Sequence, residues 1–253
     1  GVDAATSRST SEPLALGCVA IGALALCLYV LHARRQAEAV INLALFRIPT
    51  FNASVIGGSV FRIGVGAMPF LLPVLFQEKF GYSAFQSGSI TFVASVGAFG
   101  IRSMCSRILG RVGFRTLLFW CGLVAAGFTA ACGACRPTTP LLLILAILFF
   151  GGVFRSLELI AINALTYADI PPTQMSDGTT LATIVQRLAQ SMGVAIGAFI
   201  LHIASGPDGL TFGAFELAFG TVGVMAVIAS FLFTRLDPGA GSDLTGHALR
   251  KSA

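Results

Sequence analysis

The stretch FNASVIGGSVFRIGVGAMPFLLPVLF, residues 51–76, decides the fold of this chain. As a helix that rises about 1.5 Å per residue, it is roughly 39 Å long, enough to cross a hydrocarbon core of about 30 Å with some tilt. Its single charge, Arg62, then lies near the bilayer centre, where a guanidinium costs between about 3 and 17 kcal/mol unless it faces protein or a wet cavity. Pro69 and Pro73 lie four residues apart on one face, and each removes a backbone donor and favours a bend. The stretch therefore predicts a kinked transmembrane helix with a buried cation, which is typical of a transport path.

The composition of the whole chain is that of a helical membrane protein. Its mean hydropathy is +0.86 and only 11% of its 253 residues are charged, whereas a soluble domain carries about 25%. Apolar runs of about 20 residues predict helices, because the strands of a membrane barrel would alternate over about ten. The formal net charge is +5, but the cations lie inside or at the ends of the apolar runs. The expected partner is the lipid bilayer, and no nucleic acid is expected, since the sequence has no basic, aromatic-laced soluble face.

We expect an all-α membrane fold with seven transmembrane helices. The expected spans are residues 13–31, 51–76, 85–105, 116–134, 140–165, 179–203 and 211–234. A polar extracytoplasmic tail (1–12) precedes them, a linker (32–50) follows the first, and a tail (237–253) follows the last. Residues 106–115 are expected to form a basic turn. The loop at 168–177 contains Pro171-Pro172, which prevents helix continuation, and Ser176 or Asp177 can cap the helix after it.

The distribution of cations predicts the orientation of these helices. Nine lie on one side of the membrane: Arg34, Arg35, Arg47, Arg107, Arg111, Arg115, Arg235, Arg250 and Lys251. Three lie on the other: Arg8, Lys79 and Arg136. The positive-inside rule then places the N-terminus outside and the linker and C-terminus in the cytoplasm, although the loop at 168–177 carries no cation. Because the chain opens with glycine rather than methionine, we expect a fragment whose N-terminal part is missing.

Four charged side chains are expected deep in the membrane: Arg62, Arg155, Glu158 and Arg187. Arg155 and Glu158 are three residues apart on one helix and can pair with each other. Arg62 and Arg187 then lack a carboxylate in this chain, and two interpretations remain open. In the structural one, they bond to helix carbonyls, to water and to the glutamines of the sixth span. In the functional one, they bind carboxylates of a missing half or the anionic part of a substrate.

The sixth expected span carries a stripe of polar and small residues on one helical face: Gln186, Gln190, Gly193 and Gly197. Glycines four residues apart permit close approach of another helix, so we expect them to pack. The two glutamines are candidates for lining a cavity.

Other functional chemistry is not indicated. Cys132 and Cys135 have the spacing of a metal site, but without a second pair or a nearby histidine they are expected to pack a helix end. The sequence has neither a nucleophile–histidine–acid set nor a phosphate-binding loop. We therefore expect no enzyme activity, no cofactor and no metal.

The basic turn resembles a known signature. Residues 110–115, GRVGFR, are similar to the cytoplasmic D-R-x-G-R-R motif of the major facilitator superfamily, with matches at Arg111, Gly113 and Arg115. Gly110 stands where the aspartate is usual and Phe114 where a basic residue is, as in the weaker copy of the second half of such proteins. Further likeness lies in MPFLLP (68–73) with Gln77, GYSAFQSG (81–88), IPP (170–172) with Ser176, GVAIG (193–197), Arg62-Ile-Gly and Arg155-Ser156.

These passages, within about residues 37–236, resemble the fourteen-span drug:proton antiporter-2 subfamily, and in particular the multidrug-resistance exporters of bacterial inner membranes. The resemblance implies that residues 13–31 are a linker helix and that 51–236 form the C-terminal six-helix half, built from two inverted three-helix repeats. It also implies export of small amphiphilic substrates by alternating access, driven by protons, together with an N-terminal half. The candidate residues for the substrate or coupling path are Arg62, Arg155, Glu158, Gln186, Arg187 and Gln190.

Two alternatives remain open at this point. One is a non-transporting seven-span scaffold, which a gene starting near Gly1 would favour. The other is a facilitator for metabolites without proton coupling, which would still transport after collapse of the proton gradient.

Overall fold

A computed structural model of the chain describes residues 43–205 and 209–237. The expected span at 13–31 and the expected tails, apart from Asp237, lie outside these residues. The elements are η1 (Leu43–Arg47), α2 (Pro49–Phe80), α3 (Ala84–Gly100), α4 (Arg102–Val112), α5 (Phe114–Ala134), α6 (Leu141–Tyr167), η2 (Pro172–Gln174), α7 (Met175–Ala204) and α8 (Phe212–Phe233). Five helices are long and apolar enough to cross a membrane, or six if α3 and α4 form one bent span. The all-α membrane fold is confirmed.

Helix α2 begins and ends where local chemistry dictates. Pro49 occupies the first turn, where its missing N–H has no intrahelical partner to lose. The helix stops at Gly81, whose positive φ of 67° lets its amide bond back to the carbonyl oxygen of Phe76. Between these ends the helix is continuous through Pro69 and Pro73. Each proline leaves the carbonyl four residues earlier without its usual donor.

The expected basic turn at 106–115 is wrong for most of its length. Helix α3 begins with a capping box of Ser83 and Gln86, and ends at Gly100 rather than at the expected Cys105. After a bend of 54°, the chain continues as α4 to Val112. Helix α4 is amphipathic although it contains several arginines, because Cys105 and Leu109 lie four residues apart and are both buried. The reversal itself is at Gly113, whose φ of 79° favours glycine.

The expected cap of the sixth span is also wrong. Helix α7 begins at Met175, directly after the 3-10 turn η2, and its N-cap is Gln174 without a side-chain hydrogen bond. Ser176 and Asp177 therefore lie inside the first turn rather than before it. The carboxylate of Asp177 still interacts favourably with the positive end of the helix dipole from this position.

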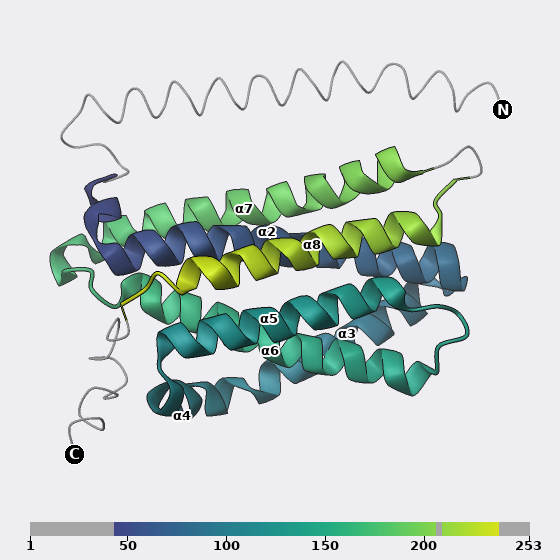
Figure 1. The fold of residues 1–253 in the computed structure, drawn as a ribbon, viewed down its shortest axis with the longest axis horizontal. Coiled ribbons are helices and arrows are strands. Elements are labelled where there is room, and N and C mark those ends of the chain that lie inside the picture. Colours follow the sequence, from purple (N-terminus) through teal and green to yellow (C-terminus); the bar gives the residue numbers. More distant parts are fainter. Residues whose placement is uncertain (1–42, 206–208, 238–253) are drawn as a thin grey trace. The chain divides into compact units, whose positions relative to one another are not determined.

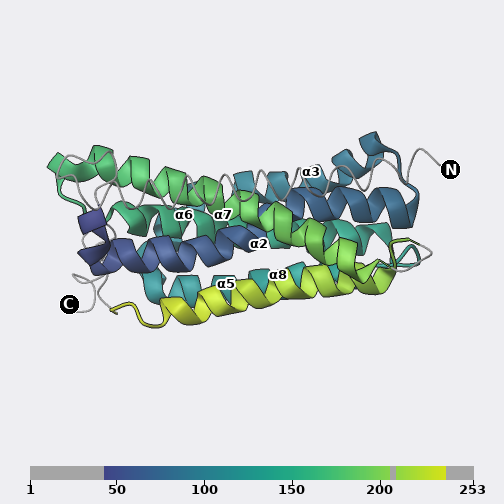
Figure 2. The same ribbon diagram turned by 90° about the horizontal axis from the view of Figure 1, so that it is seen from above.

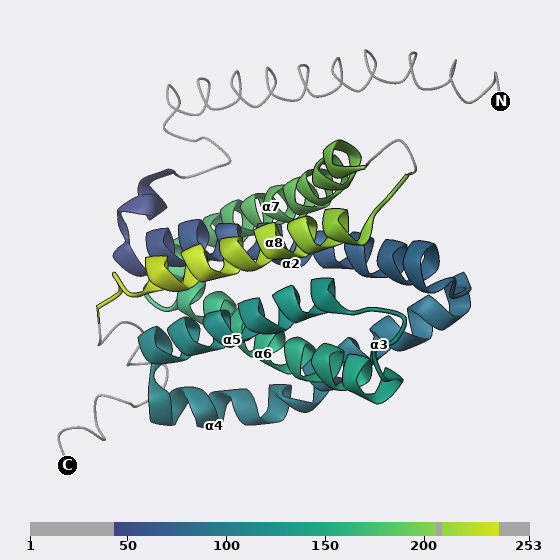
Figure 3. The same cartoon turned by 45° about the vertical axis from the view of Figure 1, so that its right-hand side comes forward.

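The packing of the helices has a two-fold pattern. Helix α2 packs mainly against α7, α3 against α6, and α5 against α8. Suppose that α2 corresponds to α6, α3 to α7 and α5 to α8. Exchanging each helix for its counterpart turns the α2–α7 pair into the α6–α3 pair and leaves the α5–α8 pair unchanged. The α5–α6 and α2–α8 contacts exchange in the same way. Figures 1 and 3 show the result, with α2, α7 and α8 grouped on one side and α3, α5 and α6 on the other. This is the pattern that two three-helix repeats would give.

Glycines make the two equivalent crossings close. Gly66 of α2 and Gly193 of α7 lie against each other's helix, and a Cβ on either would overlap a backbone carbonyl oxygen across the crossing. Gly97 of α3 and Gly152 of α6 do the same at the α3–α6 crossing. Such backbone contacts supply the van der Waals packing that holds membrane helices together where no hydrophobic force acts between them. Seen from above in Figure 2, α7 crosses α2 and then approaches α8.

Candidate functional site

Arg62 lies in the interior of α2 and is only 3% exposed. Its Nη2 donates to Oδ1 of Asn163 on α6 at 2.5 Å, and Nε2 of Gln186 on α7 donates to the same oxygen at 3.5 Å. Gly58, one turn earlier, leaves room for the guanidinium, since a Cβ there would lie 2.8 Å from Nη1. Tyr167, at the end of α6, is near enough to interact electrostatically with Arg62. The cation is thus held by amide oxygen rather than by a carboxylate.

This cluster reaches the surface of the half. Asn163 is exposed and Gln186 is half-buried, so the amides cover the guanidinium from one side. The arrangement contains features of both interpretations of Arg62. The guanidinium has a protein partner, as the structural interpretation requires. The exposed amides also give an anionic group an approach to the cation, as the functional one requires.

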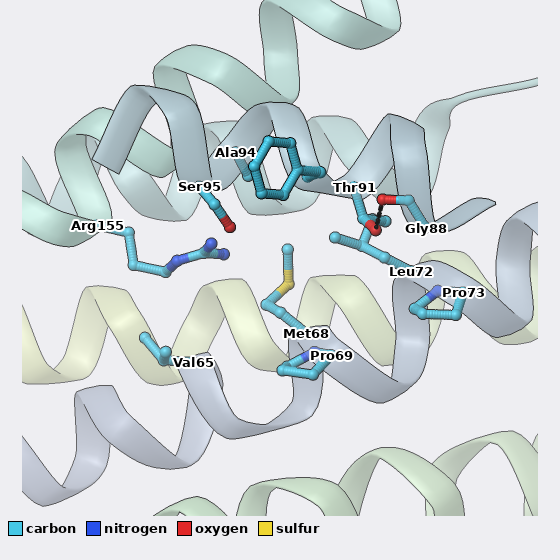
Figure 4. A pocket seen from close by; sticks show the side chains of 11 residues that line it. Val65, Met68, Pro69, Leu72, Pro73, Gly88, Thr91, Ala94, Ser95 and Arg155 are labelled. Carbon is cyan, nitrogen blue, oxygen red and sulfur yellow. Dashed lines mark hydrogen bonds between the residues drawn. The ribbon is translucent and has the colours of Figure 1, made fainter. Parts of the chain in front are cut away.

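Arg155 of α6 lies in a different place, at a cavity of about 370 Å³ between α2, α3 and α6. Figure 4 shows its guanidinium pointing into the cavity, between Ser95 of α3 and Met68 of α2. Pro69 and Pro73 line the same cavity from α2. The remaining wall consists of Val65, Leu72, Gly88, Thr91, Phe92 and Ala94. Within the described residues Arg155 makes no hydrogen bond or ion pair. The cavity is therefore mainly apolar, with one cation that no carboxylate of the described residues neutralises.

Glu158 does not pair with Arg155, contrary to the sequence expectation. Three residues along a helix correspond to a rotation of about 300°, and packing turns the two side chains toward different neighbours. Glu158 is fully buried among α5, α6 and α8, where its carboxylate oxygens would lie 3.0 and 3.1 Å from a Cβ placed on Gly122. Ser230 of α8 faces the same glycine. Neither carboxylate oxygen has a hydrogen-bond partner in the part of the chain that the structure describes.

The other candidate residues of α7 lie on different faces of this helix. Arg187 is exposed, and within residues 43–205 and 209–237 it has no ion pair. Gln190 is half-buried, and its backbone lies against Gly66 at the α2–α7 crossing. Gly193 and Gly197 are buried and face α2. The structure thus brings Gln186 to Arg62 but leaves Arg187 outside that cluster.

The matching residues of the signature lie at one junction. Arg111 is in the last turn of α4, Gly113 forms the reversal, and Arg115 is in the first turn of α5. Both arginines are exposed. The positive φ of Gly113 explains the glycine at this position, because an L side chain would be strained there.

Sequence reasoning missed Asn163, the direct partner of Arg62. The available signal was a lone amide in an otherwise apolar helix, because a polar group at membrane depth needs a partner.

At the other end of the bundle, the structure brings together residues that the sequence placed only on one side of the membrane. Arg136 forms an ion pair with Glu216 of α8, and the cations of Arg136 and Lys79 lie 4.6 and 5.7 Å from the ring centroid of Phe212.

Comparison with known proteins identifies relatives. A family model described as the Major Facilitator Superfamily matches residues 10–194. A protein curated as "Putative multidrug resistance protein MdtD" from Pectobacterium atrosepticum is 32% identical over 89% of this chain and 50% of its own length. Proteins of the same name from Shigella boydii and Escherichia coli are each 31% identical over 96% of this chain and 53% of theirs. The chain therefore spans about half the length of the curated relatives it matches.

Proposed function

Because the chain belongs to the major facilitator superfamily, we propose that it is the C-terminal half of a proton-coupled exporter of drugs or other amphiphilic small molecules. The relatives named for multidrug resistance support this substrate class. Transport would proceed by alternating access between this half and an N-terminal half. We further propose that residues 51–236 form the transporter half and 13–31 a linker helix, in a bacterial inner membrane with the N-terminus outside and the C-terminus in the cytoplasm.

The observation that carries the proposal is the cavity at Arg155. Ligand cavities are typically about 300–1,000 Å³, mostly apolar, with a few polar groups that fix orientation. The cavity here, at about 370 Å³, meets each of these criteria. Met68 and Phe92 provide soft apolar contact, while the guanidinium offers several N–H donors and a fixed charge. An amphiphile with an anionic or hydrogen-bond-accepting group matches this lining.

Efflux of a fluorescent amphiphile by the full-length protein tests the assignment. We expect Arg155→Ala to reduce efflux and to weaken binding of anionic amphiphiles more than that of neutral ones. The matched control is Arg136→Ala, which removes a cation from the far end of the bundle and is expected to leave efflux unchanged. Equal efflux by both variants and the wild type would exclude the cavity as the substrate site.

Glu158 is the candidate proton carrier of this half. Among the described residues, no other carboxylate lies buried at the centre of the helices. Ionising or protonating this side chain switches a charge on or off at the junction of α5, α6 and α8, where its oxygens have no hydrogen-bond partner among the described residues. Glu158→Gln keeps the shape and removes the titration. We expect this variant to lose gradient-driven efflux while it keeps substrate binding.

A facilitator without proton coupling is the second candidate, and one observation favours it. Glu158 lies outside the cavity lining, so substrate and proton do not share a site in this half. Collapse of the proton gradient with an ionophore separates the two functions. Efflux that stops supports the exporter, and efflux that continues down the substrate gradient supports the facilitator.

A further inference from the structure

Helix α4 combines three features that together point to a ligand. It is bent by 54° from α3, so it does not continue the direction of the preceding span. Arg102, Arg107 and Arg111 are exposed on it, while Cys105 and Leu109 are buried and join the apolar core. Arg107 and Arg111 lie four residues apart on the side opposite the buried pair, so this part of α4 has the basic face and the apolar face of an interfacial helix.

The cations of this region form no ion pair with a carboxylate of the described residues. The sequence has no aspartate or glutamate between Glu78 and Glu158. Within residues 43–205 and 209–237, neither the α4 arginines nor Arg115 form an ion pair. Asp169 is a carboxylate of the 168–177 loop, but it accepts a hydrogen bond from Thr50 at 2.7 Å. Arg107, Arg111 and Arg115 therefore present their charge outward around the α4–α5 junction, and Arg102 does so at the start of α4.

Apolar side chains are exposed beside these cations. Phe99 is 74% exposed, Met104 50% and Val112 42%. The guanidinium of Arg102 lies 5.1 Å from the centroid of the Phe99 ring. Exposed apolar groups suit acyl chains, and neighbouring arginines suit the anionic headgroups above those chains. A soluble anion would use the cations but would leave the apolar residues in water.

We infer that α4, with Arg115, is a docking surface for anionic phospholipids of the leaflet that it faces. The headgroup phosphate binds Arg107 and Arg111, with Arg102 and Arg115 adding positive charge nearby, and the acyl chains cover Phe99 and Met104. This inference rests on the chain lying in a membrane and does not depend on which substrate is transported.

Titration of the delipidated full-length protein in detergent with short-chain phosphatidylglycerol, followed by native mass spectrometry, tests the surface. Each arginine near an anionic lipid contributes about five-fold in affinity, so R107Q/R111Q is expected to bind about 30-fold more weakly than the wild type. The matched control R136Q/K79Q removes two cations from the opposite end and is expected to bind as the wild type does. R107K/R111K keeps the charge and is expected to keep most of the affinity.

Several outcomes would overturn the inference. Binding of phosphatidylglycerol by R107Q/R111Q at wild-type strength would do so, as would an equal loss in the control. Displacement of the lipid by millimolar inorganic phosphate would show a soluble-anion site instead. Absence of phosphatidylglycerol binding to the wild type would show that another part of the full-length protein covers α4. Equal affinity for phosphatidylcholine would show contact with acyl chains alone.

Discussion

Removal of the Arg62 side chain is expected to abolish transport while leaving membrane insertion intact. Arg62→Ala deletes a charge-assisted hydrogen bond to Asn163 in a site that is 3% exposed. Such bonds contribute about 1.5–3 kcal/mol, which corresponds to roughly 10- to 150-fold in any step that depends on the bond. The remaining contact to the Asn163 oxygen is the 3.5 Å one from Gln186, so α2 loses its polar link to α6 and α7 at this level.

A double-mutant cycle with Asn163→Ala separates the bond from the charge. If the bond positions the helices, the two substitutions together should cost less than the sum of the single ones, with a coupling of about 1.5–3 kcal/mol in the unfolding free energy. Initial rates of dye efflux in vesicles, normalised to protein inserted, give the transport effect. Wild-type efflux by Arg62→Ala would refute the functional interpretation. Strictly additive stabilities would refute the importance of the Arg62–Asn163 bond.

Three smaller predictions concern helix packing, a helix cap and an exposed ion pair. Gly193→Ala should destabilise the protein by about 1–3 kcal/mol in thermal unfolding, because the new methyl group overlaps the α2 backbone. Gly220→Ala, with no atom within 4 Å of the added carbon, should be neutral or slightly stabilising. Ser83→Ala should cost about 1 kcal/mol and speed amide exchange at the start of α3, through loss of the capping box. Arg136→Ala should cost no more than about 1 kcal/mol, because its ion pair is solvent-exposed, and added salt should remove the difference.

Long apolar runs made the helices predictable from sequence. Five expected spans agree in type with α2, α5, α6, α7 and α8, because runs of about 20 apolar residues can satisfy their backbone in a membrane only as helices. The error at residues 106–115 has the opposite cause. Three arginines and two glycines in ten residues indicate a turn by composition. The segment is nevertheless helical, because a helix places Cys105 and Leu109 on one face, where they are buried in the core next to α6.

The site was less predictable, because its contacts depend on how the helices rotate. Arg155 and Glu158 are close in sequence, yet one faces a cavity and the other three packed helices. Arg62 and Asn163 are 101 residues apart, and nothing in the spacing of either helix indicates that they meet. The small residues that set the rotations, such as Gly122 and Gly152, were visible in the sequence only as glycines among many. Their partners become known only from the packed bundle.

The cavity at Arg155 and the Arg62 cluster are the two polar places of this half. They are related by the same exchange of helices that relates the two three-helix groups. The cavity at Arg155 lies between α2, α3 and α6, and the Arg62 cluster joins α2, α6 and α7. Exchange of α2 with α6 and of α3 with α7 converts one set of helices into the other. In the structure, amides of Asn163 and Gln186 fill the second place, whereas the first is open. Glycine crossings of the same kind border both places, so the asymmetry lies in the side chains and in the helices that are exchanged, since α3 ends at Gly100 whereas α7 is continuous. If the two repeats exchanged conformations during transport, the filled place would open as the cavity at Arg155 closed.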